Sequence, residues 1–147
     1  MFAQWEWQNQ LPEWSTLRNL FVVDSLCSWA TGDSGSIAYT EDGEIWHSYK
    51  DLGTTENLGG IFFISKQIGW IVTRSSDKVY KTTDGGNNWE LISSLGFNLI
   101  KIAFADQQNG FVTGEGFIAK TTDGGFNWNN VFELTGSTFN YISLLIL

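Results

Sequence analysis

The chain has 147 residues, of which 42% are hydrophobic and 16% aromatic, with 16 glycines and a single proline. This composition is too apolar for a disordered chain, and the sequence has no uncharged apolar run of about 18 residues that would form a membrane span. The 16 acidic residues outnumber the 8 basic ones and leave a net charge of −8, so binding to the phosphate backbone of a nucleic acid is not expected.

The first 19 residues, 1–19, lie outside the pattern that governs the rest of the chain. The alternation in Trp5-Glu6-Trp7 predicts a strand, which we expect to be the outer strand of a closing sheet. Trp5, Trp7 and Trp14 are also a candidate binding surface, because aromatic rings stack on sugars and hold the apolar side chains of partner proteins. Packing in a closing strand is the favoured interpretation, and the other stays open.

Residues 20–131 carry a threefold repeat. Leu20, Ile61 and Ile102 follow one another at a step of 41 residues, and other aligned positions drift between 39 and 43. Self-similarity at this period is typical of repeat proteins, and short insertions in loops produce such drift. The expected units are residues 20–58, 59–98 and 99–136.

Each unit shows the pattern of four short strands. In the second unit the runs rich in β-branched and aromatic residues are Ile61–Ile64, Trp70–Thr73 and Val79–Thr82, and a fourth strand is expected from near Trp89. Four short strands in about 41 residues match one propeller blade. The sequence therefore predicts an all-β fold with almost no helix. We expect a β-propeller arc of about three four-stranded antiparallel blades, either a partial propeller or a fragment of a larger one.

A turn of fixed composition follows the third strand of each unit. It runs from Thr82 to Trp89 and from Thr121 to Trp128, and a shorter, altered copy runs from Thr40 to Trp46. Its aspartate can accept hydrogen bonds from backbone N–H groups ahead of it, its second glycine can adopt φ > 0, and its tryptophan can cover the corner. The residues assigned this structural role are Thr40, Asp42, Trp46, Thr82, Asp84, Gly86, Trp89, Thr121, Asp123, Gly125 and Trp128.

We expect no catalytic residue, no metal site and no cofactor. The turns lack the further oxygen ligands at alternate positions that an EF-hand-like calcium loop needs. The only histidine, His47, and the only cysteine, Cys27, have no accompanying catalytic motif. Asp24 and Asp106 occupy equivalent loop positions in two units, and nothing in the spacing of the carboxylates selects a pair suited to glycoside hydrolysis.

The repeated turns and the strands before them resemble the Asp-box, or BNR-repeat, propellers, and most closely the photosystem II stability/assembly-factor-like family. The residues that carry the resemblance are Phe62-Phe63, Gly69-Trp70, Lys81–Trp89, Gly110–Gly114 and Lys120–Trp128. The resemblance implies a propeller in which the Asp-box turn is scaffold.

The same resemblance implies a non-enzymatic scaffold that mediates protein–protein interaction or assembly. Photosynthetic members are thought to use a basic patch, which this acidic chain does not reproduce, so we expect a related periplasmic or secreted scaffold within a larger extracytoplasmic protein. The alternative is a carbohydrate-binding or glycoside-hydrolase-type propeller similar to xyloglucanases, with a glycan as its ligand. Sialidase activity is not expected, because Arg18 and Arg74 are too few for that family's three-arginine clamp.

The ends of the arc predict self-association. A closed propeller needs about four to eight blades, and residues 137–147 align only with the first strand of a further, incomplete blade. The chain is then a fragment of a longer product, a short chain whose copies complete a ring, or a free-standing arc. In each case the open edges expose apolar strands, and we expect association through the terminal strands.

Overall fold

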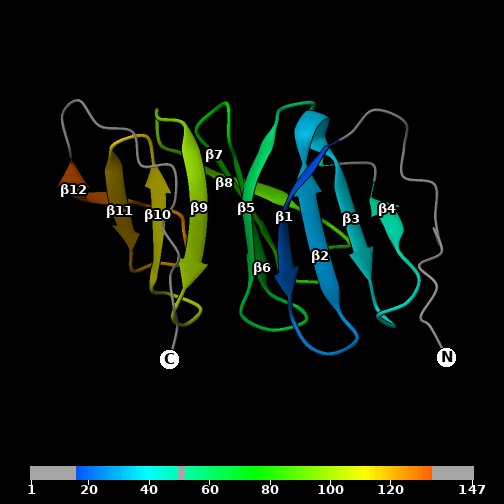
Figure 1. The fold of residues 1–147 in the computed structure, drawn as a ribbon. Coiled ribbons are helices and arrows are strands. Elements are labelled where there is room, and N and C mark those ends of the chain that lie inside the picture. The colour runs from blue at the N-terminus through cyan, green and yellow to red at the C-terminus, as the bar shows by residue number, and fades with distance from the viewer. Residues whose placement is uncertain (1–15, 50–51, 134–147) are drawn as a thin grey trace, which may run out of the picture.

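The computed structural model describes residues 16–49 and 52–133, which form three antiparallel four-stranded sheets (Figure 1). The first sheet contains β1 (Leu17–Val22), β2 (Ser28–Gly32), β3 (Ile37–Thr40) and β4 (His47–Tyr49). The second contains β5 (Leu58–Phe63), β6 (Gly69–Thr73), β7 (Lys78–Thr82) and β8 (Glu90–Ser94). The third contains β9 (Leu99–Phe104), β10 (Gly110–Gly114), β11 (Phe117–Thr121) and β12 (Asn129–Glu133).

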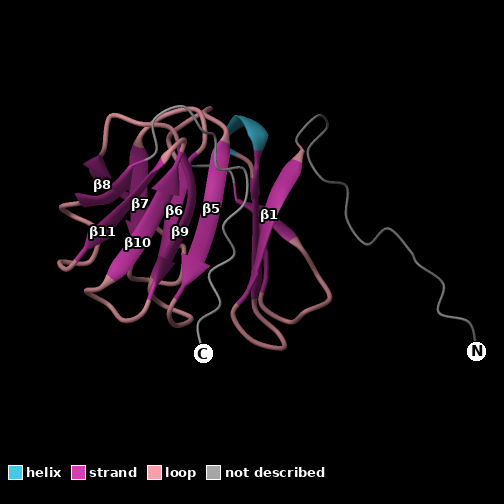
Figure 2. Cartoon of the chain, turned by 60° about the vertical axis from the view of Figure 1, so that its left-hand side comes forward, coloured by secondary structure: helices cyan, strands magenta, loops and turns pink. Residues whose placement is uncertain are grey.

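The strands of each sheet are hydrogen-bonded in chain order, so each sheet is a simple meander. The three inner strands β1, β5 and β9 lie side by side, and the sheets fan out from them as successive blades (Figures 1 and 2). Among the described residues the only helix is a 3-10 turn at Asp33–Gly35. The prediction of an all-β arc of about three four-stranded blades with almost no helix is confirmed.

Two glycines let the inner strands approach each other closely. A Cβ atom at Gly60 in β5 would lie 2.9 Å from the Cα atom of Lys101 in β9, and one at Gly59 would lie 3.0 Å from the carbonyl oxygen of Ile100. Real Cβ atoms do not approach backbone atoms to these distances without displacing them. The glycine pair therefore sets the spacing between the second and third sheets.

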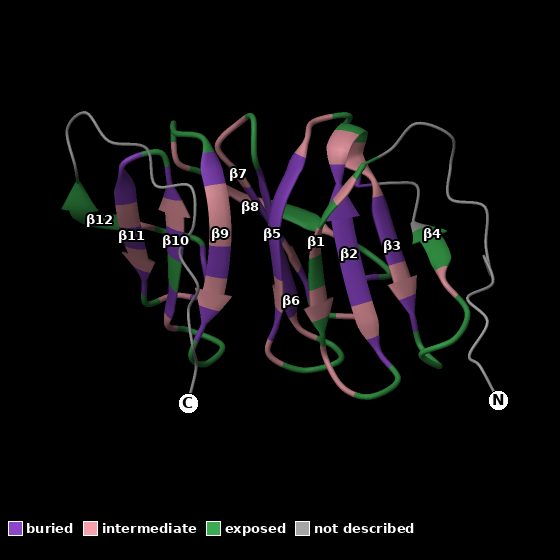
Figure 3. Cartoon of the chain, in the orientation of Figure 1, coloured by how far each residue is buried: buried purple, intermediate pink, exposed green. Residues whose placement is uncertain are grey.

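Two apolar cores fill the spaces between neighbouring sheets. Figure 3 colours the buried residues purple, and they run along the strands of all three sheets. Trp29, Phe63 and Ile71 are central to the core between the first and second sheets. Trp70, Phe104 and Val112 are central to the core between the second and third sheets. Burial of large aromatic rings from both sides makes each junction a source of stability, because buried apolar area contributes about 25 cal/mol per Å².

The face of the first sheet that points away from the other two is exposed. Leu20 in β1 is 64% exposed, although the equivalent residues Ile61 and Ile102 are only 6% and 5% exposed. Val22 is 60% exposed, against 4% for its equivalent Phe63. Within the described part of the chain, nothing covers β1 in the way that the first sheet covers β5.

Candidate functional site

The third Asp-box corner, between β11 and β12, is held by hydrogen bonds within the turn. The Asp123 Oδ1 atom accepts bonds from the backbone N–H groups of Phe126 and Asn127, both at 3.0 Å, and from the Thr121 hydroxyl at 2.8 Å. The Asn127 amide donates to Asp123 Oδ2 at 2.7 Å, and the Gly125 N–H donates to Thr121 Oγ1 at 3.0 Å. These bonds use the carboxylate to brace its own turn.

The second corner, between β7 and β8, repeats this arrangement. Thr82 Oγ1 donates to Asp84 Oδ1 at 2.8 Å and accepts the Gly86 N–H at 2.9 Å, while the Asn88 N–H donates to Asp84 Oδ1 at 2.9 Å. Gly86 has φ of +87°, a conformation that side chains disfavour. The same local chemistry thus shapes two corners that are one repeat apart.

The first corner is one residue shorter and keeps the bonds of the aspartate. Asp42 Oδ1 accepts the N–H groups of Glu44 at 2.9 Å and Ile45 at 2.8 Å, and the Gly43 N–H donates to Thr40 Oγ1 at 3.0 Å. The loss of one glycine therefore leaves a closed turn, with a half-buried Trp46 after it.

Hydrogen bonding in the corners keeps the aspartates ionised. The backbone N–H of Asn127, followed by its side-chain amide, lowers the pKa of Asp123 to about 2. The amide and backbone N–H of Asn88 likewise lower the pKa of Asp84, and the N–H groups of Ile45 and Glu44 lower that of Asp42. A general acid needs a raised pKa near the working pH, so these carboxylates are poorly suited to that role.

The corner tryptophans pack toward the preceding sheet. Trp89 lies edge-on to the rings of Trp29 and Phe63, with centroids 6.2 and 5.8 Å away. The indole N–H of Trp128 donates to the Gly125 carbonyl at 2.9 Å and to the Ser93 hydroxyl at 3.2 Å. The tryptophans therefore cover their corners and also join adjacent sheets.

The other chemistry-bearing residues are not assembled into a catalytic group. Cys27 is buried, and burial raises the pKa of its thiol, which disfavours the reactive thiolate. The exposed His47 lies beside Tyr39, with ring centroids 5.4 Å apart. Among the described residues no group of three His, Cys, Asp or Glu side chains is placed to hold a metal ion.

The loop carboxylates have structural partners too. Asp24 accepts the N–H groups of Leu26 and Cys27, and Lys66 is the main cause of the lowering of its pKa to about 2. Asp106 accepts equivalent N–H groups in the third sheet. Asp33 forms a two-pronged pair with Arg18, with both N–O distances 2.6 Å. Trp5, Trp7 and Trp14 lie outside the described residues, so the surface expected of them stays a prediction.

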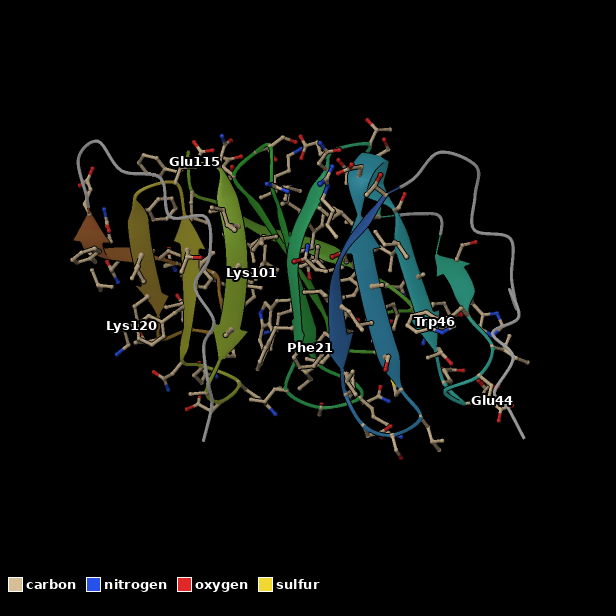
Figure 4. All side chains as sticks on the ribbon, in the orientation of Figure 1. Phe21, Glu44, Trp46, Lys101, Glu115 and Lys120 are labelled. Carbon is tan, nitrogen blue, oxygen red and sulfur yellow. The ribbon has the colours of Figure 1, made fainter. Side chains whose placement is uncertain are left out.

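A polar bridge on the inner strands was not anticipated from the sequence. The Lys101 ammonium on β9, labelled in Figure 4, donates to Asn19 Oδ1 on β1, and the Asn19 amide donates to the Gly59 carbonyl on β5 at 2.8 Å. Thr31 donates to the same carbonyl at 2.9 Å. Burial, assisted by the charge of Arg74, lowers the pKa of Lys101. The bridge ties all three inner strands together.

A groove of about 290 Å³ lies between β8 of the second sheet and β11 and β12 of the third. None of the residues that line it is ionisable, which disfavours acid–base catalysis there. Phe97 and Phe126 are 57% and 52% exposed, and both rings border the groove. The groove is also lined by Ser93, Phe117, Trp128 and Asn130.

One sequence signal could have pointed to this groove. Phe126 takes the place of the polar Asn87 in the otherwise matching second corner. An exposed aromatic residue that departs from a repeat is not explained by the repeat, and it is a candidate for binding.

Comparison with known proteins shows which family this arrangement belongs to. A family model described as the photosynthesis system II assembly factor YCF48 matches residues 44–135, which is more than half of the chain. The chain belongs to this family. The prediction of an Asp-box propeller similar to photosystem II assembly factors is thereby confirmed.

Two solved YCF48 structures share the fold. YCF48 bound to a D1 peptide is 26% identical with a TM-score of 0.73, and the match covers 83% of this chain and 42% of that one. YCF48 from Cyanidioschyzon merolae is 22% identical with a TM-score of 0.71, and the match covers 83% of this chain and 38% of that one. This chain therefore spans less than half the length of the YCF48 structures that it matches.

A more distant likeness extends to an enzyme. An ancestral GH74 enzyme is 17% identical with a TM-score of 0.57, and the match covers 76% of this chain and 18% of that one. At this identity the likeness concerns the fold alone. No curated protein sequence matches the chain. The described residues contain no helix that is long and apolar enough to span a membrane.

Proposed function

We propose that this chain is a non-enzymatic propeller scaffold that binds an extended segment of a partner protein and so assists the assembly of a complex. Membership of the assembly-factor family supports a role in protein interaction. The related YCF48 structure is bound to a D1 peptide, which supports a peptide as the kind of ligand. The aspartates and threonines of the Asp-box corners are structural in this proposal, because their hydrogen bonds lie within the corners.

The observation that carries the proposal is the chemistry of the groove between β8 and β12. Its aromatic side chains, Phe97, Phe117, Phe126 and Trp128, can enclose the apolar side chain of a peptide. The side-chain amides of Asn127 and Asn130 beside them have donor and acceptor capacity for the N–H and C=O groups of an extended backbone. A lining with aromatic and neutral polar groups, and no ionisable one, fits recognition better than reaction.

The net charge of −8 narrows the choice of partner segment. A negative surface steers basic or neutral segments toward the groove and repels acidic ones, and added salt screens this effect. The expectation that the partner lies outside photosynthesis rests on the same acidic character and stays a prediction.

Two finer parts of the proposal concern place and association. We propose an extracytoplasmic location, periplasmic or secreted, which antibody detection in fractionated source cells can measure. We also propose that copies of the chain associate through their terminal sheets, where Leu20 and Val22 are exposed.

The binding proposal is tested with the D1 peptide as the first probe, followed by a panel of extended peptides with one aromatic or aliphatic residue. Fluorescence polarisation of labelled peptides gives the dissociation constants. Phe97→Ala should weaken binding about tenfold, because a buried aromatic contact is lost. Leu26→Ala removes an apolar side chain of similar exposure, 50% against 57% for Phe97, from a loop of the first sheet and should leave binding unchanged.

Two results would count against peptide recognition in this groove. If Phe97→Ala and Leu26→Ala weaken peptide binding equally, the peptide does not bind in the groove. Binding of oligosaccharides on a glycan array, lost in Phe97→Ala while no peptide binds, would instead favour the carbohydrate-binding alternative, since sugars also stack on aromatic rings.

A further inference from the structure

Neighbouring sheets of this chain are joined by one pair of positions, seen most clearly between the second and third sheets. Trp70 on β6 donates its indole N–H to the Gly124 carbonyl in the next corner at 3.0 Å. Lys81, paired with Trp70 across β6 and β7, reaches the same carbonyl at 3.4 Å and lies 5.5 Å from the centroid of the Phe126 ring. The pair on one sheet therefore holds the Asp-box corner of the next sheet.

The junction between the first and second sheets uses the equivalent pair, Trp29 and Tyr39. The two rings are stacked with centroids 4.8 Å apart. A Cβ atom at Gly86 would lie only 2.2 Å from the Trp29 ring, so the ring packs directly against the second glycine of the next corner. Two junctions with different side chains thus share one geometry.

The third sheet carries the same pair of positions. Phe111 and Lys120 are register partners on β10 and β11, as Trp70 and Lys81 are on β6 and β7. The Lys120 ammonium lies 5.9 Å from the centroid of the Phe111 ring. Phe111 is 36% exposed, whereas Trp70 is fully buried. This pair is placed to hold a further corner.

The corner of the first sheet is the matching surface. The Gly43 N–H bonds to Thr40 Oγ1 as the Gly125 N–H bonds to Thr121 Oγ1, at 3.0 Å in both corners. The three atoms nearest to a Cβ atom built at Gly43 are backbone atoms of Ser25 and Leu26 from the same sheet, whereas at Gly86 they belong to the Trp29 ring of the neighbouring sheet.

Glu44 stands at the place in this corner where Phe126 stands in the third. Its N–H donates to Asp42 Oδ1 at 2.9 Å, as the Phe126 N–H donates to Asp123 Oδ1 at 3.0 Å. In the complete junction Lys81 lies over Phe126, so a lysine arriving at the first corner would meet the Glu44 carboxylate instead. Figure 4 shows Glu44 and Lys120 at opposite ends of the arc and on the same rim.

We propose that the third sheet of one copy docks on the first sheet of a second copy, with Lys120 paired to Glu44 and the Phe111 ring packed on Gly43. The contact would also cover Leu20 and Val22, the apolar residues that lie exposed on the outer face of β1. The charges are complementary, because the first corner adds Glu41 and Asp42 to Glu44 and the opposite face offers Lys120.

A head-to-tail contact of this kind gives a closed ring when its rotation closes. The three sheets that the structure describes would contribute six blades from two copies, which lies within the range of about four to eight blades of closed propellers. The proposal specifies the contact for the self-association proposed above. It is independent of peptide binding in the groove, so either can fail alone.

The test is sedimentation velocity of the full chain over a range of micromolar concentrations, with the variants Glu44→Lys, Lys120→Glu and the two combined. Each single reversal places like charges together and should weaken dimerisation at least about tenfold, while the charge-exchanged double variant should restore it. Glu115→Lys changes the net charge as Glu44→Lys does, but it lies on the opposite rim and should leave the dimer unchanged (Figure 4). Circular dichroism confirms that each variant is folded.

Phe111→Ala tests the apolar part of the contact and should also weaken the dimer. A wild-type chain that stays monomeric at every concentration would overturn both the contact and self-association. A dimer that tolerates Glu44→Lys and Lys120→Glu would overturn this contact alone, as would equal weakening by Glu115→Lys. Failure of the combined variant to recover dimerisation would show that Lys120 and Glu44 do not face each other.

Discussion

The two junctions inside this chain occupy equivalent positions and are built from different chemistry. Between the first and second sheets, Trp29 is stacked between Tyr39 and Phe63, with centroids 4.8 and 5.2 Å away. Between the second and third sheets, Trp70 is stacked on Phe104 at 3.7 Å and also donates a hydrogen bond to Gly124. The first junction depends on the fit of rings, and the second adds directional polar contacts.

The corner tryptophans show the same contrast. The Trp128 N–H has two acceptors, whereas the buried Trp89 N–H has no hydrogen-bond partner among the residues that the structure describes. Leaving a buried donor unpaired costs about 1–3 kcal/mol, which the aromatic contacts around Trp89 must offset. The repeat therefore fixes where the sheets meet, and the side chains at these positions decide which interactions join them.

The largest difference between the two junctions is expected when the second glycine of each corner, Gly86 or Gly125, is replaced by alanine. A Cβ atom at Gly86 would lie 2.2 Å from the Trp29 ring, while one at Gly125 meets its nearest atom, of Ile92, at 3.0 Å. Both glycines have φ > 0, which costs an alanine about 1–2 kcal/mol, and overpacking adds about 1–3 kcal/mol where the ring cannot move. We expect Gly86→Ala to lower the free energy of unfolding by about 2–5 kcal/mol and Gly125→Ala, where the nearest atom is the end of the flexible Ile92 side chain, by about 1–3 kcal/mol.

Urea denaturation followed by tryptophan fluorescence measures both values. Equal losses in the two variants would contradict the view that the first junction is the more tightly fitted. Gly53→Ala is the control for backbone strain alone, because Gly53 also has φ > 0 and a Cβ atom there would have no neighbour within 4 Å.

A smaller effect is expected at the aspartate of the third corner. Hydrogen bonds from Asn127 lower the folded-state pKa of Asp123 to about 2 from its ordinary value of 3.8. Its charged form therefore stabilises the fold above about pH 4, and this contribution is lost as the pH falls through about 2. Asp123→Asn should cost about 1 kcal/mol at neutral pH, like the loss of a helix cap, and should flatten the decline of stability in this acid range.

Thermal unfolding of the wild type and Asp123→Asn at several pH values between neutrality and pH 2 measures this difference. Parallel curves for the two proteins would show that Asp123 does not contribute to the acid dependence. Asp84→Asn supplies the comparison at the second corner, where the pKa of the carboxyl is also lowered by Asn88.

The strands and corners could be predicted because their causes are local and repeated. The hydrogen bonds of Asp84 and Asp123 reach no further than four residues, and three copies of the pattern reinforce one another. Alternating apolar and β-branched residues fixed the strands between the corners in the same way.

The contacts between sheets could not be predicted, because they depend on how the blades are placed in space. Trp70 and Gly124 are 54 residues apart, and Lys101 and Asn19 are 82 apart. The groove was missed for a related reason. Phe126 has no aromatic counterpart in the other corners, so an alignment of the repeats gives it no role. The family and fold were therefore accessible from the sequence, and the candidate binding site required the structure.

The smallest loss of stability is expected at Ser93, at the junction between the second and third sheets. Ser93 on β8 donates to the Gly125 carbonyl at 2.8 Å and accepts the Trp128 N–H at 3.2 Å. Ser93→Ala removes both bonds but leaves the Trp128 N–H its second acceptor, the Gly125 carbonyl, so no buried donor is orphaned. We expect a loss of about 1 kcal/mol in the free energy of unfolding, measured by urea denaturation. Ser94→Ala, at the next residue of β8, is the comparison: it removes the hydrogen bond from the Ser94 hydroxyl to Asp77 Oδ2, which lies within the second sheet and joins no two sheets. A loss of more than about 3 kcal/mol would mean that polar contacts dominate the second junction, and that its rings do not hold the sheets together as those of the first junction do.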